Sequence, residues 1–206
     1  MPAILSLFLW KYMNLGQRWF AILLWFVVAI SFAGEIWLWL GGESNLPFFH
    51  VYILIECLFI IRIFAFLLNN ALTSTARYIL SFGFSGLWLV NVLVGEGWRN
   101  YPDYIHALEA LIILTLVFKW FLKMLREKTI TRPQKTFEFW LCTGLLVFFS
   151  GNFLLFLFSE FLLTIEMSAY YAIWKLHIIL NLVLYLIYTL ALSLLEKRRH
   201  DSVKKE

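Results

Sequence analysis

Charged residues are scarce in this chain. Of its 206 residues, 15% are Asp, Glu, Lys or Arg and 62% are hydrophobic, whereas about a quarter of a soluble domain is charged. The chain therefore lacks the polar surface that a soluble enzyme, a nucleic-acid-binding domain or a sizeable extramembrane domain needs. A spanning helix takes about 20 apolar residues, so the apolar content is enough for about six spans. The composition predicts an integral membrane protein.

Proline and cysteine are also scarce. There are four prolines, and Pro47, Pro102 and Pro133 lie at the ends of long apolar runs, where a missing backbone N–H is tolerated. Each run can therefore form an unbroken helix, as the bilayer requires. The two cysteines, Cys57 and Cys142, lie inside apolar runs, so we expect free, buried side chains rather than a disulfide bond.

Several motifs of enzyme active sites are missing as well. The chain has no P-loop glycine pattern, no G-x-S-x-G motif, no H-E-x-x-H motif and no paired cysteines at zinc spacing. No catalytic residue is therefore predicted, and the sequence does not favour enzyme activity.

Six long apolar runs are bounded by charges, Pro or Gly. They cover roughly 19–40, 47–68, 78–95, 104–125, 137–158 and 171–194. The predicted fold class is all-α, a polytopic bundle of six transmembrane helices. It divides into a short N-terminal cytoplasmic or interfacial segment (1–18), the helical domain (19–195) and a basic cytoplasmic tail (196–206).

Lys and Arg alternate from one connection to the next. They occur before the first run, between the second and third, between the fourth and fifth, and after the sixth. The 41–47 and 159–170 connections have none, and in the 95–103 connection Arg99 stands against two acids. Basic connections stay on the cytoplasmic side. We therefore expect both termini to be cytoplasmic, in a bacterial cytoplasmic (inner) membrane.

Residues 2–13 form an apolar run that is too short to cross a bilayer. The run lacks the pattern of a signal peptide. One interpretation is an interfacial helix or a mobile terminus. The other is the inner end of a further span that begins upstream, which would make the protein a seven-helix one.

Polar side chains inside spans are costly and are functional candidates by default. Three histidines lie near the outer ends of the second, fourth and sixth runs, which cross the membrane in the same direction, and two glutamates follow them at greater depth. We therefore predict a polar pocket that is open to the outside and closed beneath by apolar packing. The candidate ligand-binding residues are His50, Tyr52, Glu56, His106, Glu109, Asn152, His177 and Asn181.

Most of these residues also have a purely structural interpretation. His50 could bond a lipid headgroup or a carbonyl at a helix end, and His106 could pair with Glu109 on the same helix face. His177 could be an interhelical hydrogen-bond partner. Glu56, close to the predicted midplane, is the hardest to explain without a function.

Three segments carry a resemblance to a known group of proteins. They are NLPFFHVYILIECLF (45–59), FEFWLCTGLLVFFSGNFLLFLFS (137–159) and WKLHIILNLVLYLIYTLAL (174–192). The chain resembles small, uncharacterised multi-pass bacterial membrane proteins, which are similar to the membrane input modules of sensor-kinase systems. The resemblance implies a cytoplasmic signalling partner such as a sensor kinase. The matching positions are His50, Tyr52, Glu56, Ser150, Gly151, Asn152, His177 and Asn181.

Three functions therefore stay open. The first is a sensory or ligand-binding signalling module that responds to a small molecule, a lipid headgroup or pH through the outer pocket. The second is a metal- or haem-binding membrane protein, because histidines and carboxylates are ligands for zinc and iron. The third is a small transporter or an assembly subunit, although the inner halves of the spans offer few polar groups beyond Tyr185 and Tyr188. The sequence specifies the lipid bilayer as surroundings and excludes nucleic acid as a partner, but it leaves the ligand, cofactor and oligomeric state unknown.

Overall fold

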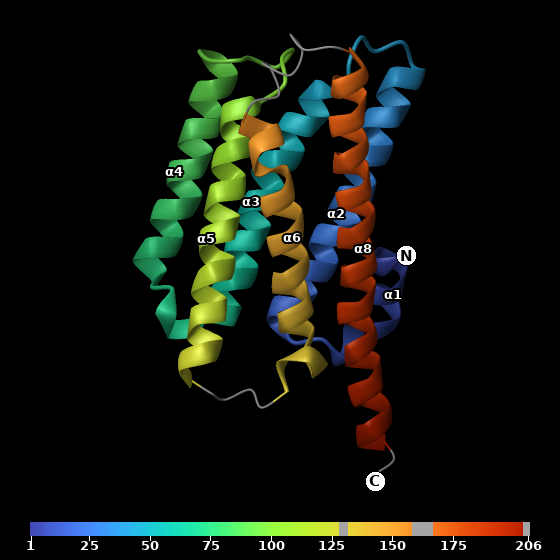
Figure 1. The fold of residues 1–206 in the computed structure, drawn as a ribbon, viewed down its shortest axis with the longest axis vertical. Coiled ribbons are helices and arrows are strands. Elements are labelled where there is room, and N and C mark those ends of the chain that lie inside the picture. Colours follow the sequence, from blue (N-terminus) through green and yellow to red (C-terminus); the bar gives the residue numbers. More distant parts are fainter. Residues whose placement is uncertain (128–131, 158–166, 204–206) are drawn as a thin grey trace.

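The chain is an all-α bundle (Figure 1). The structure is a computed structural model that describes residues 1–127, 132–157 and 167–203, and this part contains no strand. Its helices are α1 (Pro2–Leu9), α2 (Leu15–Trp39), α3 (Leu46–Leu68), α4 (Ser74–Leu93), α5 (Asp103–Glu127), α6 (Phe137–Leu157) and α8 (Met167–Val203), with 3-10 turns at Trp10–Tyr12, Asn69–Ala71 and Pro133–Lys135. In the described part, six helices are long and apolar enough to cross a membrane. All six predicted spans are therefore confirmed as helices of a multi-pass membrane protein.

Capping groups decide where several helices begin. At the start of α2, Asn14 Oδ1 accepts a hydrogen bond from Gln17 N (2.9 Å), and Gln17 Oε1 accepts one from Asn14 N (3.0 Å). Thr73 Oγ1 accepts from Ala76 N (3.2 Å) at the start of α4. Such caps satisfy backbone N–H groups that have no partner within the helix. Both helices therefore begin about four residues before their apolar runs.

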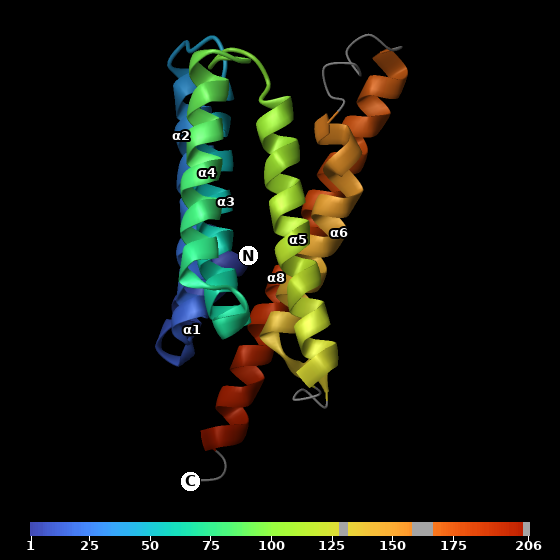
Figure 2. The same cartoon turned by 90° about the vertical axis from the view of Figure 1, so that its left-hand side faces the viewer.

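The long helices pack around a ring. Each of the pairs α2–α3, α3–α5, α5–α6 and α6–α8 is in contact, and α4 lies outside against α3 and α5. We call the end with the 40–45 and 94–102 connections, uppermost in Figures 1 and 2, the upper end, and the opposite end the lower end. The backbones of α2 and α8 approach each other closely at few points, and α1 packs against both. The helix α1 therefore fills part of the space between α2 and α8, which also meet through side chains such as Phe20 and Tyr188.

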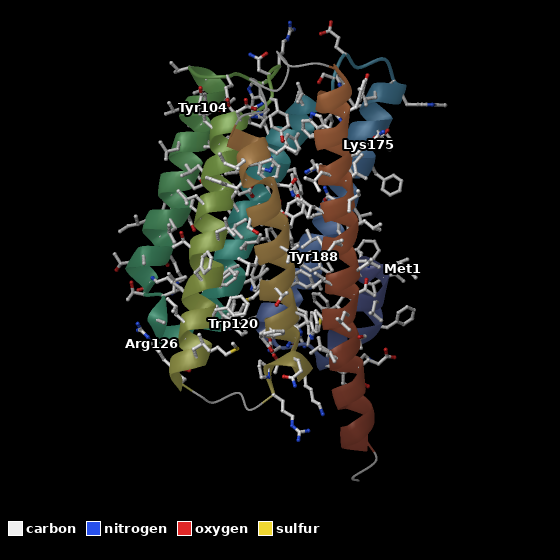
Figure 3. The ribbon with its side chains drawn as sticks, in the orientation of Figure 1. Met1, Tyr104, Trp120, Arg126, Lys175 and Tyr188 are labelled. Atoms are coloured by element: carbon white, nitrogen blue, oxygen red, sulfur yellow. The ribbon has the colours of Figure 1, made fainter. Side chains whose placement is uncertain are left out.

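The short helix α1 packs with one face against the side of the bundle and does not lie flat across its end. Pro2, Ala3, Ser6 and Leu9 are buried. Met1 lies near the mid-height of the bundle, so α1 occupies the lower half of the gap between α2 and α8 (Figure 3). Both interpretations of this segment, an interfacial helix or mobile terminus and the inner end of a longer span, stay predictions.

Aromatic and aliphatic side chains fill the lower half of the ring. The Phe20 ring packs edge-on against Tyr188 (centroids 4.8 Å apart) and against Phe137 (5.5 Å). Cys57 and Cys142 are both free and fully buried in the same core. This packing forms an apolar layer between the two ends of the bundle.

Candidate functional site

A cavity of about 270 Å³ lies inside the upper part of the ring, between α2, α3, α5, α6 and α8. Five of the eight predicted site residues line it: Tyr52, Glu56, His106, His177 and Asn181. They come from α3, α5 and α8, three helices that run in the same direction. Their positions in the apolar runs predict a common depth in the membrane, and in the structure these side chains line one cavity.

His177 is held at the cavity wall through both ring nitrogens. Its Nδ1 lies 2.9 Å from Asn152 Oδ1 on α6, and its Nε2 lies 2.9 Å from Asn181 Nδ2, one turn along α8. Asn152 Nδ2 donates to the Phe148 carbonyl (2.8 Å), which turns Oδ1 towards the ring. His177 Nδ1–H therefore donates to Asn152, and Nε2 accepts from Asn181. Asn152 does not line the cavity, but its hydrogen bond holds the ring of His177, which does.

His106 is fixed from the side of the upper connection and of α6. The Tyr101 hydroxyl lies 2.9 Å from His106 Nδ1, and the imidazole stacks on Phe156 with centroids 3.6 Å apart. Its Nε2 is 3.8 Å from Glu109 Oε2, which is longer than a hydrogen bond. The two residues share a helix face, as the spacing predicted, but they do not form a hydrogen bond with each other.

Glu109 lies behind the cavity wall and is 0% exposed. Neither of its carboxyl oxygens has a hydrogen-bond partner. A buried polar group without a partner is costly, so this position is not explained by local stability. Glu109 is close enough to Glu56 on α3 to interact electrostatically.

Glu56 forms the buried end of the cavity. Its side chain is 6% exposed, and Tyr52, one helical turn earlier, interacts with its carboxyl group. The spacing of four residues places both groups on one face of α3. Glu56 is therefore a carboxyl group inside the bundle that a ligand in the cavity can reach.

His50 does not reach the cavity, which corrects the expected meeting of three histidines. Its Nε2–H donates to the Asn100 carbonyl (3.0 Å), Trp88 Nε1 donates to the His50 carbonyl (2.9 Å), and its ring packs edge-on against Trp98. At 100° per residue, six positions separate His50 from Glu56 by about 120° around the helix. His50 thus lies near the predicted end of its helix, but on the face that points away from the cavity. There it contacts the connection between α4 and α5.

Other cavity residues were missing from the predicted set. Glu35, near the upper end of α2, lines the cavity together with Gly34. Aromatic rings complete the wall: Phe48, Phe49, Phe148 and Tyr185. A usable signal was present for Tyr185, because it lies four residues after Asn181 and shares its helix face.

The connection between α4 and α5 is ordered by Glu96. Its carboxyl group accepts hydrogen bonds from Asn91 Nδ2 (2.7 Å) and Tyr104 N (3.3 Å), and its carbonyl accepts one from Asn100 Nδ2 (2.7 Å). Partial burial raises the pKa of Glu96 despite the opposing effect of these hydrogen bonds. This connection lies against His50 at the upper end of the bundle, beside the cavity, and we call residues 94–102 the cover of the bundle.

A second cavity, of about 560 Å³, lies at the lower end. Lys123 is on its wall, where Nζ donates to the carbonyls of Leu67 and Leu68 at the end of α3 (3.2 and 3.1 Å). Gln17 Nε2 donates to Glu138 Oε1 (3.2 Å) nearby. The apolar layer around Phe20 lies between this cavity and the upper one, so the described residues form no polar path between them.

Comparison with known proteins identifies no relative. No family model matches the chain, and neither a curated protein nor a solved structure is similar to it. The function therefore has to be argued from the residues of the site.

The site does not have the arrangement of a metal centre. In the described ranges, no group of three or more His, Cys, Asp or Glu side chains could hold a metal ion. The physical reason is visible in the geometry: both nitrogens of His177 and one of His106 are occupied by protein partners, and His50 lies elsewhere. The metal or haem interpretation gains no support from these residues.

Proposed function

We propose that this chain is the ligand-binding, sensory module of a signalling system in the bacterial cytoplasmic membrane. The observation that carries the proposal is the upper cavity, which gathers five of the predicted polar residues from three helices around a space of about 270 Å³. A polar cavity of this size inside an apolar bundle is typical of a small-molecule site.

The distribution of charge supports an outward-facing cavity. The ends of α3, α5 and α8 and the starts of α4 and α6, which border the basic segments of the sequence, lie at the lower end of the bundle, opposite the cavity. Basic segments face the cytoplasm. The connection between α1 and α2 and the end of α8 then face the cytoplasm, and the cavity takes its ligand from the outer side.

Binding fits the site better than transport. A transporter needs alternating access to both sides of the membrane, usually through broken helices near the midplane. Here the helices that surround the cavity continue unbroken past it, and the Phe20, Tyr188 and Phe137 rings close the ring below. A ligand that enters this cavity leaves by the way it came.

The helix α8 offers a direct route from the cavity to the cytoplasm. It carries His177, Asn181 and Tyr185 at the cavity wall and continues to Val203. At 1.5 Å per residue, the distance from Asn181 to Val203 is about 33 Å. Since the backbones of α8 and α2 approach each other closely at few points, a ligand lodged between them would change their separation and shift the bundle between two packings. The basic tail would transmit this shift to a sensor kinase or a similar cytoplasmic partner.

The test uses the purified chain in lipid nanodiscs. Spin labels at Ile36→Cys on α2 and Ile179→Cys on α8, two exposed positions, would report the distance across the gap. A library of small molecules is screened for thermal stabilisation, and each hit is examined for a change in this distance. We expect a ligand that stabilises the protein and narrows the distance distribution. Stabilising ligands that leave the distance unchanged would contradict the sensory role.

A further inference from the structure

The charged residues on the cavity wall are all acidic. Glu35 and Glu56 line the cavity, and no Lys or Arg does so among the described residues. Glu109 lies behind the wall and adds a third acidic group within electrostatic range of Glu56. An anion would meet like charges in a low-dielectric interior, which is strongly unfavourable. The charge of the wall therefore selects a cation or a neutral molecule.

The two lining acids differ in depth. Glu35 is exposed near the upper end of α2, whereas Glu56 is 6% exposed at the buried end of the cavity. A cation would thus meet one carboxyl group at the rim and the other at the bottom. Burial makes the interaction with Glu56 the stronger of the two, because surrounding water screens the rim.

The aromatic lining favours an organic cation over a metal ion. Phe49 and Tyr52 stack with centroids 5.9 Å apart, and Phe148 and Tyr185 line the cavity from α6 and α8. Ring faces attract ammonium groups within about 6 Å. A hard metal cation such as Ca²⁺ is instead surrounded by about six to eight oxygen atoms, and among the described residues no three His, Cys, Asp or Glu side chains are grouped so that they could hold a metal ion. The lining resembles the aromatic surroundings that hold organic ammonium groups.

An apolar groove continues from the cavity. It has a volume of about 450 Å³ and shares Val27, Ser31 and Tyr185 with the cavity wall. It lies between α2 and α8 next to the N-terminal end of α1, and the backbones of α2 and α8 approach each other closely at few points. Leu24, Leu182 and other apolar residues form its sides, and no Asp, Glu, Lys, Arg or His lines it in the described chain. The space beside the ammonium position thus suits a hydrocarbon group.

We infer that the cavity binds an organic ammonium ion, with the ammonium group between Glu56 and the aromatic rings and its apolar substituent in the groove between α2 and α8. This inference rests on the proposed function, because it names the ligand class of the same cavity. It makes Glu56 the principal charge partner, Glu35 a rim residue, and Leu186 on the groove a contact of the substituent.

The test measures binding of four simple probes to the full chain in nanodiscs, with empty nanodiscs as the baseline for partition into lipid. Hexylammonium, hexanol and hexanoate share a chain and differ in head group, and ethylammonium keeps the head group with a short chain. We expect hexylammonium to bind at least about tenfold more tightly than hexanol and hexanoate, as charge-assisted contacts require. Comparable affinity for all three head groups, or no binding of hexylammonium at millimolar concentration, would overturn the inference.

Three variants assign the contacts. Glu56→Gln should weaken hexylammonium binding about tenfold or more, whereas Glu43→Gln, an exposed position off the cavity wall, should leave it unchanged. Leu186→Trp fills the groove and should weaken hexylammonium more than ethylammonium. If it affects both probes equally, the groove does not hold the substituent and that part of the inference fails. Thermal unfolding of each variant verifies that it is folded.

The outcomes separate this inference from the proposed function. If hexanol or hexanoate binds in the cavity and changes the distance between α2 and α8, the sensory role stands and the ammonium class is wrong. If hexylammonium binds through Glu56 without changing that distance, the ligand class stands and the sensory role is wrong.

Discussion

His177 and Asn152 join α8 to α6 through a 2.9 Å hydrogen bond at the wall of the upper cavity. The bond is directional, because Asn152 Nδ2 already donates to the Phe148 carbonyl and leaves only Oδ1 for the imidazole. Asn181 completes the arrangement from the other side of the ring. The position of a cavity residue on α8 is thus set by a residue on α6 that does not touch the cavity.

Replacing Asn152 with Leu should destabilise the bundle and alter the cavity together. The change leaves His177 Nδ1–H without its acceptor in an apolar interior, which costs about 1–2 kcal/mol. The free energy of unfolding, measured by denaturant titration in mixed micelles, gives the size of the effect. Ser150→Ala is the matched control on the same helix, since Ser150 Oγ bonds only the Leu146 carbonyl of its own helix (2.6 Å). Equal losses for the two variants would argue against an interhelical role of Asn152.

His50→Ala should loosen the upper connection and leave the cavity intact. The imidazole bonds the Asn100 carbonyl and packs against Trp98, and it does not line the cavity. We expect faster hydrogen exchange at the backbone amides of residues 95–101 and unchanged affinity for a cavity ligand such as hexylammonium. His106→Ala, which removes a cavity residue, is the comparison. A loss of affinity in His50→Ala as large as in His106→Ala would show that the assignment of His50 is wrong.

The depth of the polar residues in the membrane was predictable from the sequence. The direction in which each of them points around its helix was predictable only in part. Helix direction follows from the number of spans, so the common depth of His106 and His177 could be deduced from the positions of the runs alone. The face towards the cavity depends on how α3 is rotated against its neighbours, and His50 and Tyr52, two residues apart, ended on different sides. Apolar residues surround both, so no amphipathic pattern fixes the rotation.

The gap between α2 and α8 could not be derived from the sequence. All six spans were visible as apolar runs, but which helices touch depends on pairwise packing of similar surfaces. The run at 2–13 was too short to span and left two interpretations open, and the packing of α1 against both α2 and α8 was not specified by the sequence. The aromatic residues of the cavity, such as Phe48, stand in apolar runs with many other phenylalanines, so the sequence does not distinguish those on the wall from those in the core.

The cover of the bundle should respond to pH through Glu96. Partial burial raises the pKa of Glu96 above its ordinary value of 4.5. A carboxyl group with a raised pKa in the folded protein binds its proton more tightly when folded, so its contribution to stability is complete below the unfolded pKa and is lost as pH rises through the folded pKa. We expect the free energy of unfolding, measured by denaturant titration, to fall over this range. Glu96→Gln keeps an acceptor for Tyr104 and should remove the pH dependence; a persistent dependence in this variant would assign it to another group.

Filling the cavity from α2 should abolish ligand binding without unfolding the bundle. Gly34 is on the cavity wall, and a Cβ added there would lie 3.6 Å from Asn45 Cβ and 3.7 Å from Phe48 Cβ, which is ordinary contact. The outer carbons of Gly34→Leu would therefore enter the cavity. Gly86→Leu on α4 is the matched control, because nothing lies within 4 Å of a Cβ at that position. Isothermal titration of both variants with hexylammonium should show binding only to Gly86→Leu, while their unfolding temperatures stay similar. If Gly34→Leu binds the probe as the unaltered chain does, the ligand lies outside this cavity, because the added side chain and the ligand would need the same space.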